Sequence, residues 1–200
     1  MLMKGHVITG DVAVTLVDLA TRELLQIEPS PDEEGEEWII TSALESAPQH
    51  QRDTLATYEK TLLTGMAARL ADIRAAPGAA VSLSMLAEQM PSVLRKTQEQ
   101  ITSEVVHRGW VHHLRHGEQT TAGKELAREV CSFQQALGRL VSIQDAAALP
   151  PQLLPYTLHF GLVGNDGPPL ARFAHVCMRA FTLKFNWPDR TLVLGRWPPT

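Results

Sequence analysis

The sequence predicts a mainly helical α+β protein with two winged-helix-like modules, the first of them incomplete, and a C-terminal helical segment. Hydrophobic residues make up 44% of the 200 residues, which is enough apolar material for a folded core. Apolar residues recur at helical spacing in several long segments, and short aliphatic runs typical of strands lie between them. The predicted units are residues 1–48, 49–145 and 146–200, and the last ends in a tail rich in tryptophan and proline.

The first module begins with a helix over residues 11–20, where Asp11 stands at the N-cap position. Strands are expected at residues 24–27 and 38–40, and the polar, proline-containing segment between them predicts a loop. A helix that leads into such a hairpin is the second half of a winged helix. A unit of about 30 residues cannot bury a core alone, so neighbouring segments must complete this module.

The second module follows a linker at residues 43–52. Its expected elements are a helix at 53–73, a short strand at 81–83, helices at 84–90 and 92–107, and a two-stranded wing at 109–121. This order is that of a complete winged helix. A long helix then starts at Thr121. Its apolar residues alternate by four and three positions: Leu126, Val130, Phe133, Leu137 and Leu140.

The C-terminal unit contains an apolar stretch at residues 153–162 and a helix at 170–181. We expect the apolar stretch to pack against the modules. Within it, Tyr156 is amphipathic, so its ring is expected to be buried and its hydroxyl group to be paired.

Composition and charge exclude several classes of protein. The net charge of −4 argues against a nucleic-acid binder that is basic over its whole surface. The two cysteines are too few for a disulfide framework, and they fit a reducing compartment. No run approaches the roughly 18 apolar residues of a membrane-spanning helix. Residues 1–10 lack the apolar run of a signal peptide.

Charge is distributed unevenly along the chain. Residues 1–50 contain ten acids and two bases, whereas residues 51–200 contain 16 bases and 12 acids. The acids are densest in the loop of the first hairpin, at Asp32, Glu33, Glu34, Glu36 and Glu37. A solvated loop tip explains this cluster most simply. The alternative is a docking site for a basic protein partner, because clustered charge steers the encounter with an oppositely charged surface.

A DNA-binding regulator is the alternative function. The helix at 92–107 would be the recognition helix. The candidate DNA contacts are Arg95 and Lys96 on that helix and Arg108 and Arg115 in the wing. Glu99 and Glu104 on the same helix would repel phosphate. Four bases against two acids are few for a surface that must neutralise about six phosphates or more, so nucleic acid is not the expected partner.

No pattern of catalytic residues is present. The densest cluster of potential metal ligands is His107, His112, His113 and His116. On a strand, His112 and His113 would point to opposite faces, which argues against convergence on zinc. Cys131 and Cys177 fall on predicted helices, where a thiol is usually an inert apolar group. The sequence therefore predicts no catalytic residue, no metal and no cofactor, and a metal-dependent enzyme at the histidines ranks third among the hypotheses.

Several short motifs resemble one known family. They are Asp11-Val-Ala-Val-Thr-Leu-Val-Asp-Leu-Ala20, Tyr58-Glu-Lys-Thr-Leu-Leu63, Arg108-Gly-Trp110, Leu154-Pro-Tyr156 and Gly161-Leu162. Their order and spacing are similar to the cytosolic C-terminal region of YciQ-like predicted membrane proteins, a family of unknown function. Thr157 replaces the alanine usual in that family. The resemblance implies an intracellular location beside a membrane and implies no reaction.

These observations together predict a non-catalytic, cytosolic protein-interaction or regulatory domain of a membrane-associated protein. The expected partner is a protein, with a basic segment as the candidate for the acidic loop. Contact with a membrane would be indirect, through a parent chain or a partner.

Overall fold

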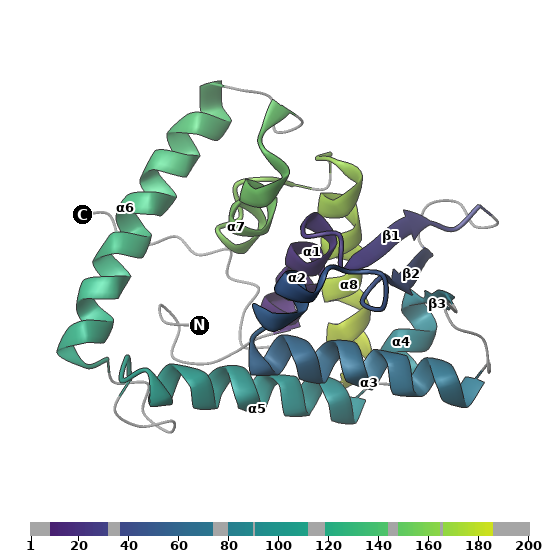
Figure 1. Cartoon of the computed structure of the whole chain (residues 1–200). Coiled ribbons are helices and arrows are strands. Elements are labelled where there is room, and N and C mark those ends of the chain that lie inside the picture. The colour runs from purple at the N-terminus through teal and green to yellow at the C-terminus, as the bar shows by residue number, and fades with distance from the viewer. Residues whose placement is uncertain are drawn as a thin grey trace.

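The computed structural model describes residues 9–31, 37–73, 80–89, 91–111, 119–143, 148–164 and 166–185. In these ranges helices surround a small antiparallel sheet, which confirms the predicted mainly helical α+β class (Figure 1). The helices there are α1 (Thr9–Thr21), α2 (Gln49–Asp53), α3 (Thr57–Ile73), α4 (Leu83–Gln89), α5 (Pro91–His107), α6 (Thr121–Ile143), α7 (Leu154–His159) and α8 (Pro169–Phe185), with a 3-10 turn η2 (Pro151–Leu153). The strands are β1 (Leu25–Pro29), β2 (Trp38–Ser42) and β3 (Ala80–Ser82).

The sheet joins segments that are far apart in the sequence. Strands β1 and β2 form the predicted antiparallel hairpin, with Leu25 opposite Ser42 and Pro29 opposite Trp38. Strand β3 pairs antiparallel with the other edge of β2, so the strand order is β1-β2-β3. The short strand expected in the second module thus extends the hairpin of the first. The boundaries at residues 48 and 145 stay predictions, although residues on both sides of 48 share this sheet.

Three helices end in the same left-handed turn. After α5, Gly109 has φ of 68°, and Trp110 N–H donates to the carbonyl of Val105 at 3.1 Å. After α7, Gly161 adopts φ of 67° with the equivalent hydrogen bond. After α1, Glu23 occupies this position with φ of 61°, although a residue with a Cβ atom is strained there. The turn at Glu23 directs the chain from α1 into β1.

Helices α3 and α5 lie side by side and run in opposite directions (Figure 1). A Cβ atom built on Gly65 of α3 would collide with the side chain of Val93 of α5, so the absence of a side chain permits this close approach. Helix α4 packs instead on α8 and the sheet. The expectation of an unbroken linker at residues 43–52 is wrong, because α2 begins inside it.

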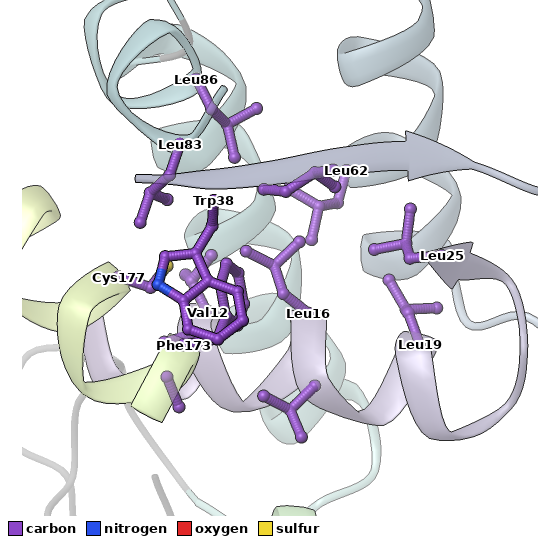
Figure 2. Close-up of a cluster of buried hydrophobic side chains, with 14 of the residues drawn as sticks. Val12, Leu16, Leu19, Leu25, Trp38, Leu62, Leu83, Leu86, Phe173 and Cys177 are labelled. Atoms are coloured by element: carbon purple, nitrogen blue, oxygen red, sulfur yellow. The ribbon is translucent and has the colours of Figure 1, made fainter. Parts of the chain in front are cut away.

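One hydrophobic core cluster contains residues from the sheet and from α1, α3, α4, α7 and α8. Trp38 of β2 and Phe173 of α8 meet edge to face, with ring centroids 5.6 Å apart. Figure 2 shows Cys177 of α8 and Leu16 of α1 beside the same indole ring. All four side chains are at most 2% exposed. The centre of this core is therefore the place where α1, the sheet and α8 meet.

The C-terminal apolar stretch folds as η2 and α7 and packs on α1, as expected. Leu154, Pro155, Thr157 and Leu158 are buried there. The expectation for Tyr156 is wrong, because its side chain is 48% exposed. A six-residue helix that lies on a neighbour can bury only one side, and Tyr156 falls on the other side.

The predicted wing is described at its two ends. Val111 and Gln119 form an isolated antiparallel bridge, and residues 112–118 lie outside the described ranges. Thr120 closes this turn by donating its hydroxyl hydrogen to the carbonyl of Gly109 at 2.6 Å. Across the described ranges, no helix combines the length and apolar composition needed to cross a bilayer.

Candidate interaction surface

The exposed large apolar side chains of the described ranges all lie on α6 or α7. Phe133 is 39% exposed, Tyr156 is 48% exposed and Ile143 is 82% exposed. Single exposed apolar side chains are common on protein surfaces, whereas a contiguous group of them marks an interaction site. Figure 1 shows α6 at the edge of the molecule, running away from the end of α5.

The ring of Phe133 on α6 contacts two aromatic rings, those of Tyr156 on α7 and of Phe160 at the C-cap of α7. We call this set the aromatic surface: Phe133, Tyr156 and Phe160. The rings of Phe133 and Tyr156 are nearly perpendicular, at 85°, with centroids 5.3 Å apart. Phe133 also meets Phe160 at 6.2 Å. The cluster therefore bridges α6 and the segment that contains α7, and it leaves ring edges open to solvent.

Local packing fixes the position of α6. A Cβ atom on Gly123 would collide with the carbonyl oxygen of Trp110, so only glycine permits the start of α6 to lie this close to the preceding turn. The hydroxyl group of Thr120 caps the helix by accepting a hydrogen bond from Gly123 N–H at 3.0 Å. Further along, Gly138 lies beside Leu162. Among the residues described in α6, the buried ones are Gly123 and Leu137.

The acidic loop is described only at its end, because Asp32, Glu33, Glu34 and Glu36 lie outside the described ranges. Glu37 is half-buried, and one of its carboxylate oxygens accepts hydrogen bonds from the backbone N–H groups of Ser84 at 3.1 Å and Trp38 at 3.3 Å. Ser84 lies in the first turn of α4, whose N–H groups have no partner within the helix. Glu37 therefore stabilises the start of α4.

The candidate DNA contacts within the described ranges lie at opposite ends of α5. Arg95 and Lys96 are exposed near the start of α5. Arg108 lies at the other end, where its Nε donates to Glu104 at 2.7 Å and its guanidinium covers the ring of Trp110 at 5.2 Å. Arg115 lies outside the described ranges.

A polar network that sequence reasoning missed connects α1 to α3. Arg22 Nη1 donates to Glu59 at 2.8 Å and to Asp18 at 3.0 Å. Burial opposes the charge of Arg22, but its hydrogen bond to Asp18 and the two nearby carboxylates raise its pKa. Glu59 is 5% exposed, and its second oxygen accepts a hydrogen bond from Ala56 N–H at 2.7 Å. A glutamate three residues after a helix cap is the sequence signal for such a bond.

Tyr58 lies beside this network. Burial, together with the negative charges of Glu59 and Asp18, raises its pKa to about 12. The network contains no nucleophile beside a base, so its evident role is to hold α1 against α3.

The cysteines and histidines form no reactive group in the part of the chain that is described. Cys177 is fully buried, which raises the pKa of its thiol well above the usual value, and Cys131 is half-buried on α6. His107 is exposed at the end of α5, while His112, His113 and His116 lie outside the described ranges. No group of three or more histidine, cysteine, aspartate or glutamate residues within the described ranges could hold a metal ion.

Comparison with protein-family models, with characterised proteins and with solved structures finds no match to this chain. Function must therefore be argued from the surfaces of the molecule itself.

Proposed function

We propose that this chain is a non-catalytic protein-interaction domain that docks through the aromatic surface. The observation that carries the proposal is the gathering of the exposed large apolar side chains, in the described ranges, on α6 and α7. Aromatic rings are enriched in binding hot spots because they bury a large area at a small entropic cost. Phe133 and Tyr156 support each other edge to face, so the surface is already formed before a partner arrives.

The setting of this interaction is a cytosolic face close to a membrane. The motifs that resemble the YciQ-like region support this setting, together with a cysteine content that fits a reducing compartment. In this proposal the acidic loop steers a basic protein partner, and the aromatic surface supplies the affinity after the encounter. The winged-helix-like modules then serve as a scaffold.

Site-specific photo-crosslinking in cells that express the protein tests the aromatic surface. A photo-reactive side chain at position 133 or 156 should give the same crosslinked protein, and one at the exposed position Gln135 of α6 should not. Phe133→Ala combined with Tyr156→Ala should then weaken binding of that isolated protein at least about tenfold, the range for a hot-spot pair. Equal crosslinking from all three positions would contradict the proposal.

The acidic loop is tested separately by its salt dependence. Replacing Glu33, Glu34 and Glu36 by glutamine should slow association with the captured partner at low salt and leave the stability unchanged, because exposed charges contribute little to folding. An unchanged association rate would mean that the acidic loop contributes to solubility and does not steer a partner.

The alternative function, a winged-helix DNA-binding regulator, is favoured by the succession of α3, β3, α4 and α5 and by the exposure of Arg95 and Lys96. A selection from random duplexes at physiological salt tests it. A site bound at nanomolar affinity, and lost in Arg95→Ala, would replace the proposal above.

A further inference from the structure

A groove lies between α3 and α5. Its volume is about 430 Å³, within the range of small-molecule sites. Lys60 and Thr64 of α3 and Ser92 and Lys96 of α5 line it, and Gly65 lies in its floor. None of these residues belongs to the aromatic surface, so a ligand in this groove is independent of the function proposed above.

The packing of the two helices explains how the lysines come to share this groove. Gly65 faces Val93 closely, and the helices run in opposite directions. Lys60 lies five residues before Gly65, and Lys96 lies three residues after Val93. At a rise of about 1.5 Å per residue, both lysines stand on the same side of the crossing point and at nearly the same level. The groove therefore has one ammonium group on each wall.

Both lysines are exposed, and neither ammonium group makes a hydrogen bond or an ion pair within the described part of the chain. The nearest acid along α5 is Glu99, one turn after Lys96, and no ion pair forms between them. Two uncompensated ammonium groups facing one groove attract an anion more strongly than either would alone.

The hydroxyl groups of the groove are also free. Elsewhere in the molecule, helical threonines such as Thr15 and Thr102 donate to a carbonyl of their own helix, at 2.8 Å in both cases. The hydroxyl groups of Thr61 and Thr64, which line the groove, make no hydrogen bond within the described ranges, and the same is true of the hydroxyl group of Ser92. Ser92 lies in the first turn of α5, where backbone N–H groups have no partner within the helix.

Lysine ammonium groups, serine and threonine hydroxyl groups and the N-terminus of a helix are the groups that proteins use to bind phosphate. We infer that the α3–α5 groove binds the phosphate group of a small phosphorylated ligand, with Lys60 and Lys96 holding the anion and the hydroxyl groups donating to its oxygens. The phosphate could belong to a soluble metabolite or to a lipid headgroup, and the chemistry is the same for both.

Nuclear magnetic resonance of the ¹⁵N-labelled full chain tests the inference. Titration with inorganic phosphate or glycerol phosphate, against sodium chloride at equal ionic strength, should shift the amide signals of the groove in a saturable way. Lys60→Gln combined with Lys96→Gln should weaken binding at least about tenfold, the value of a charged hydrogen bond. Arg95→Gln is the matched control for the single variant Lys96→Gln, because each removes one positive charge from neighbouring positions of α5 and Arg95 does not line the groove.

The source of the phosphate is distinguished by vesicles. Binding to phosphatidylcholine vesicles that contain phosphatidic acid, but not to pure phosphatidylcholine, would indicate a lipid headgroup. Saturable binding of glycerol phosphate without vesicle binding would indicate a soluble ligand, and either result supports the site. If the lysine double variant fails to fold, Thr61→Val with Thr64→Val replaces it and should also weaken binding.

Three results would overturn the inference. The first is the absence of saturable shifts with either phosphate compound. The second is equal weakening by Arg95→Gln and by Lys96→Gln, which indicates a general surface charge. The third is displacement of bound phosphate by duplex DNA, with an affinity for DNA that depends on Arg95, because this result indicates a nucleic-acid surface.

Discussion

Helices α1 and α6 are both amphipathic, yet the molecule uses them in opposite ways. Helix α1 buries its whole apolar face, with Val12, Leu16 and Leu19 at most 2% exposed. Helix α6 is ten residues longer (23 residues against 13), yet among its described residues it buries only Gly123 and Leu137. An apolar stripe shows that a helix needs a partner. The number of neighbouring elements decides whether the fold itself supplies that partner.

The neighbours of the two helices explain the difference. Helix α1 contacts α7, α8, β1 and α5. Helix α6 contacts the turn at Trp110 through Gly123 and the segment that contains α7 through Phe133 and Gly138. These contacts cover part of its apolar stripe and leave Phe133, a member of the aromatic surface, 39% exposed.

Thiol reactivity gives the largest expected difference between the two regions. Cys177 in the core should react with an aromatic disulfide reagent only when the core opens. Cys131 on α6 should react in the folded protein. Since core opening costs up to the full stability, on the order of 5 kcal/mol or more, the rates should differ by about a thousandfold or more. The variants Cys131→Ser and Cys177→Ser show which cysteine gives the fast phase of the thiol reaction and which gives the slow phase. Comparable rates would mean that α8 opens locally.

Removal of one aromatic ring from the core and of one from α6 should change the stability of the protein by different amounts. Trp38→Ala should lower the free energy of unfolding by about 3–5 kcal/mol, because the indole ring is 2% exposed. Phe133→Ala should lower it by about 1 kcal/mol or less, because the ring is already part-solvated. Urea denaturation followed by circular dichroism measures both changes. Similar losses would show that α6 belongs to the core.

Alkaline pH should destabilise the folded protein through ionisation of Tyr58. Its pKa is near 10 in the unfolded chain and about 12 in the folded protein, so ionisation favours unfolding. The stabilisation is complete below pH 10 and is lost as the pH rises from 10 to 12. Tyr58→Phe should therefore show a smaller fall in Tm across this interval. Cys177→Ala serves as a control, because the buried thiol contributes to alkaline sensitivity from a lower pH. An identical fall in wild type and Tyr58→Phe would contradict the assignment.

The smallest expected effect concerns the exit from α1. Glu23 adopts a left-handed conformation that Gly109 and Gly161 occupy at the ends of α5 and α7. Glu23→Gly should raise the free energy of unfolding by about 1 kcal/mol, because the side chain is exposed and glycine removes the strain. Glu28→Gly, at an exposed position of β1, is the matched control and should lower the free energy of unfolding. A loss of stability in Glu23→Gly would show that the carboxylate has a role of its own.

Much of the local structure could be predicted because its signals are local. Gly109 after α5 and Pro91 at the start of α5 mark helix ends by backbone geometry alone. The expectation that Asp11 is the N-cap of the first helix is wrong, because α1 begins at Thr9 and Asp11 lies in its first turn. The two strands of the hairpin could be predicted from two short aliphatic runs on either side of a polar segment. Other features could not be predicted, because they depend on residues far apart in the chain. Glu37 caps a helix that begins at Leu83, and Arg22 pairs with Glu59.

The sequence by itself determined the long helices and the hairpin of this protein, since helical periodicity and turn residues act over a few positions. It did not show the short helices α2 and α7. Only the tertiary structure decided which apolar faces are covered. It placed β3 beside β2, brought Lys60 and Lys96 to one groove, and left Tyr156 exposed although its neighbours are buried. The physical reason is that burial is a property of packing. A side chain loses its water only when other segments cover it, and no pattern within one helix specifies which segments those are.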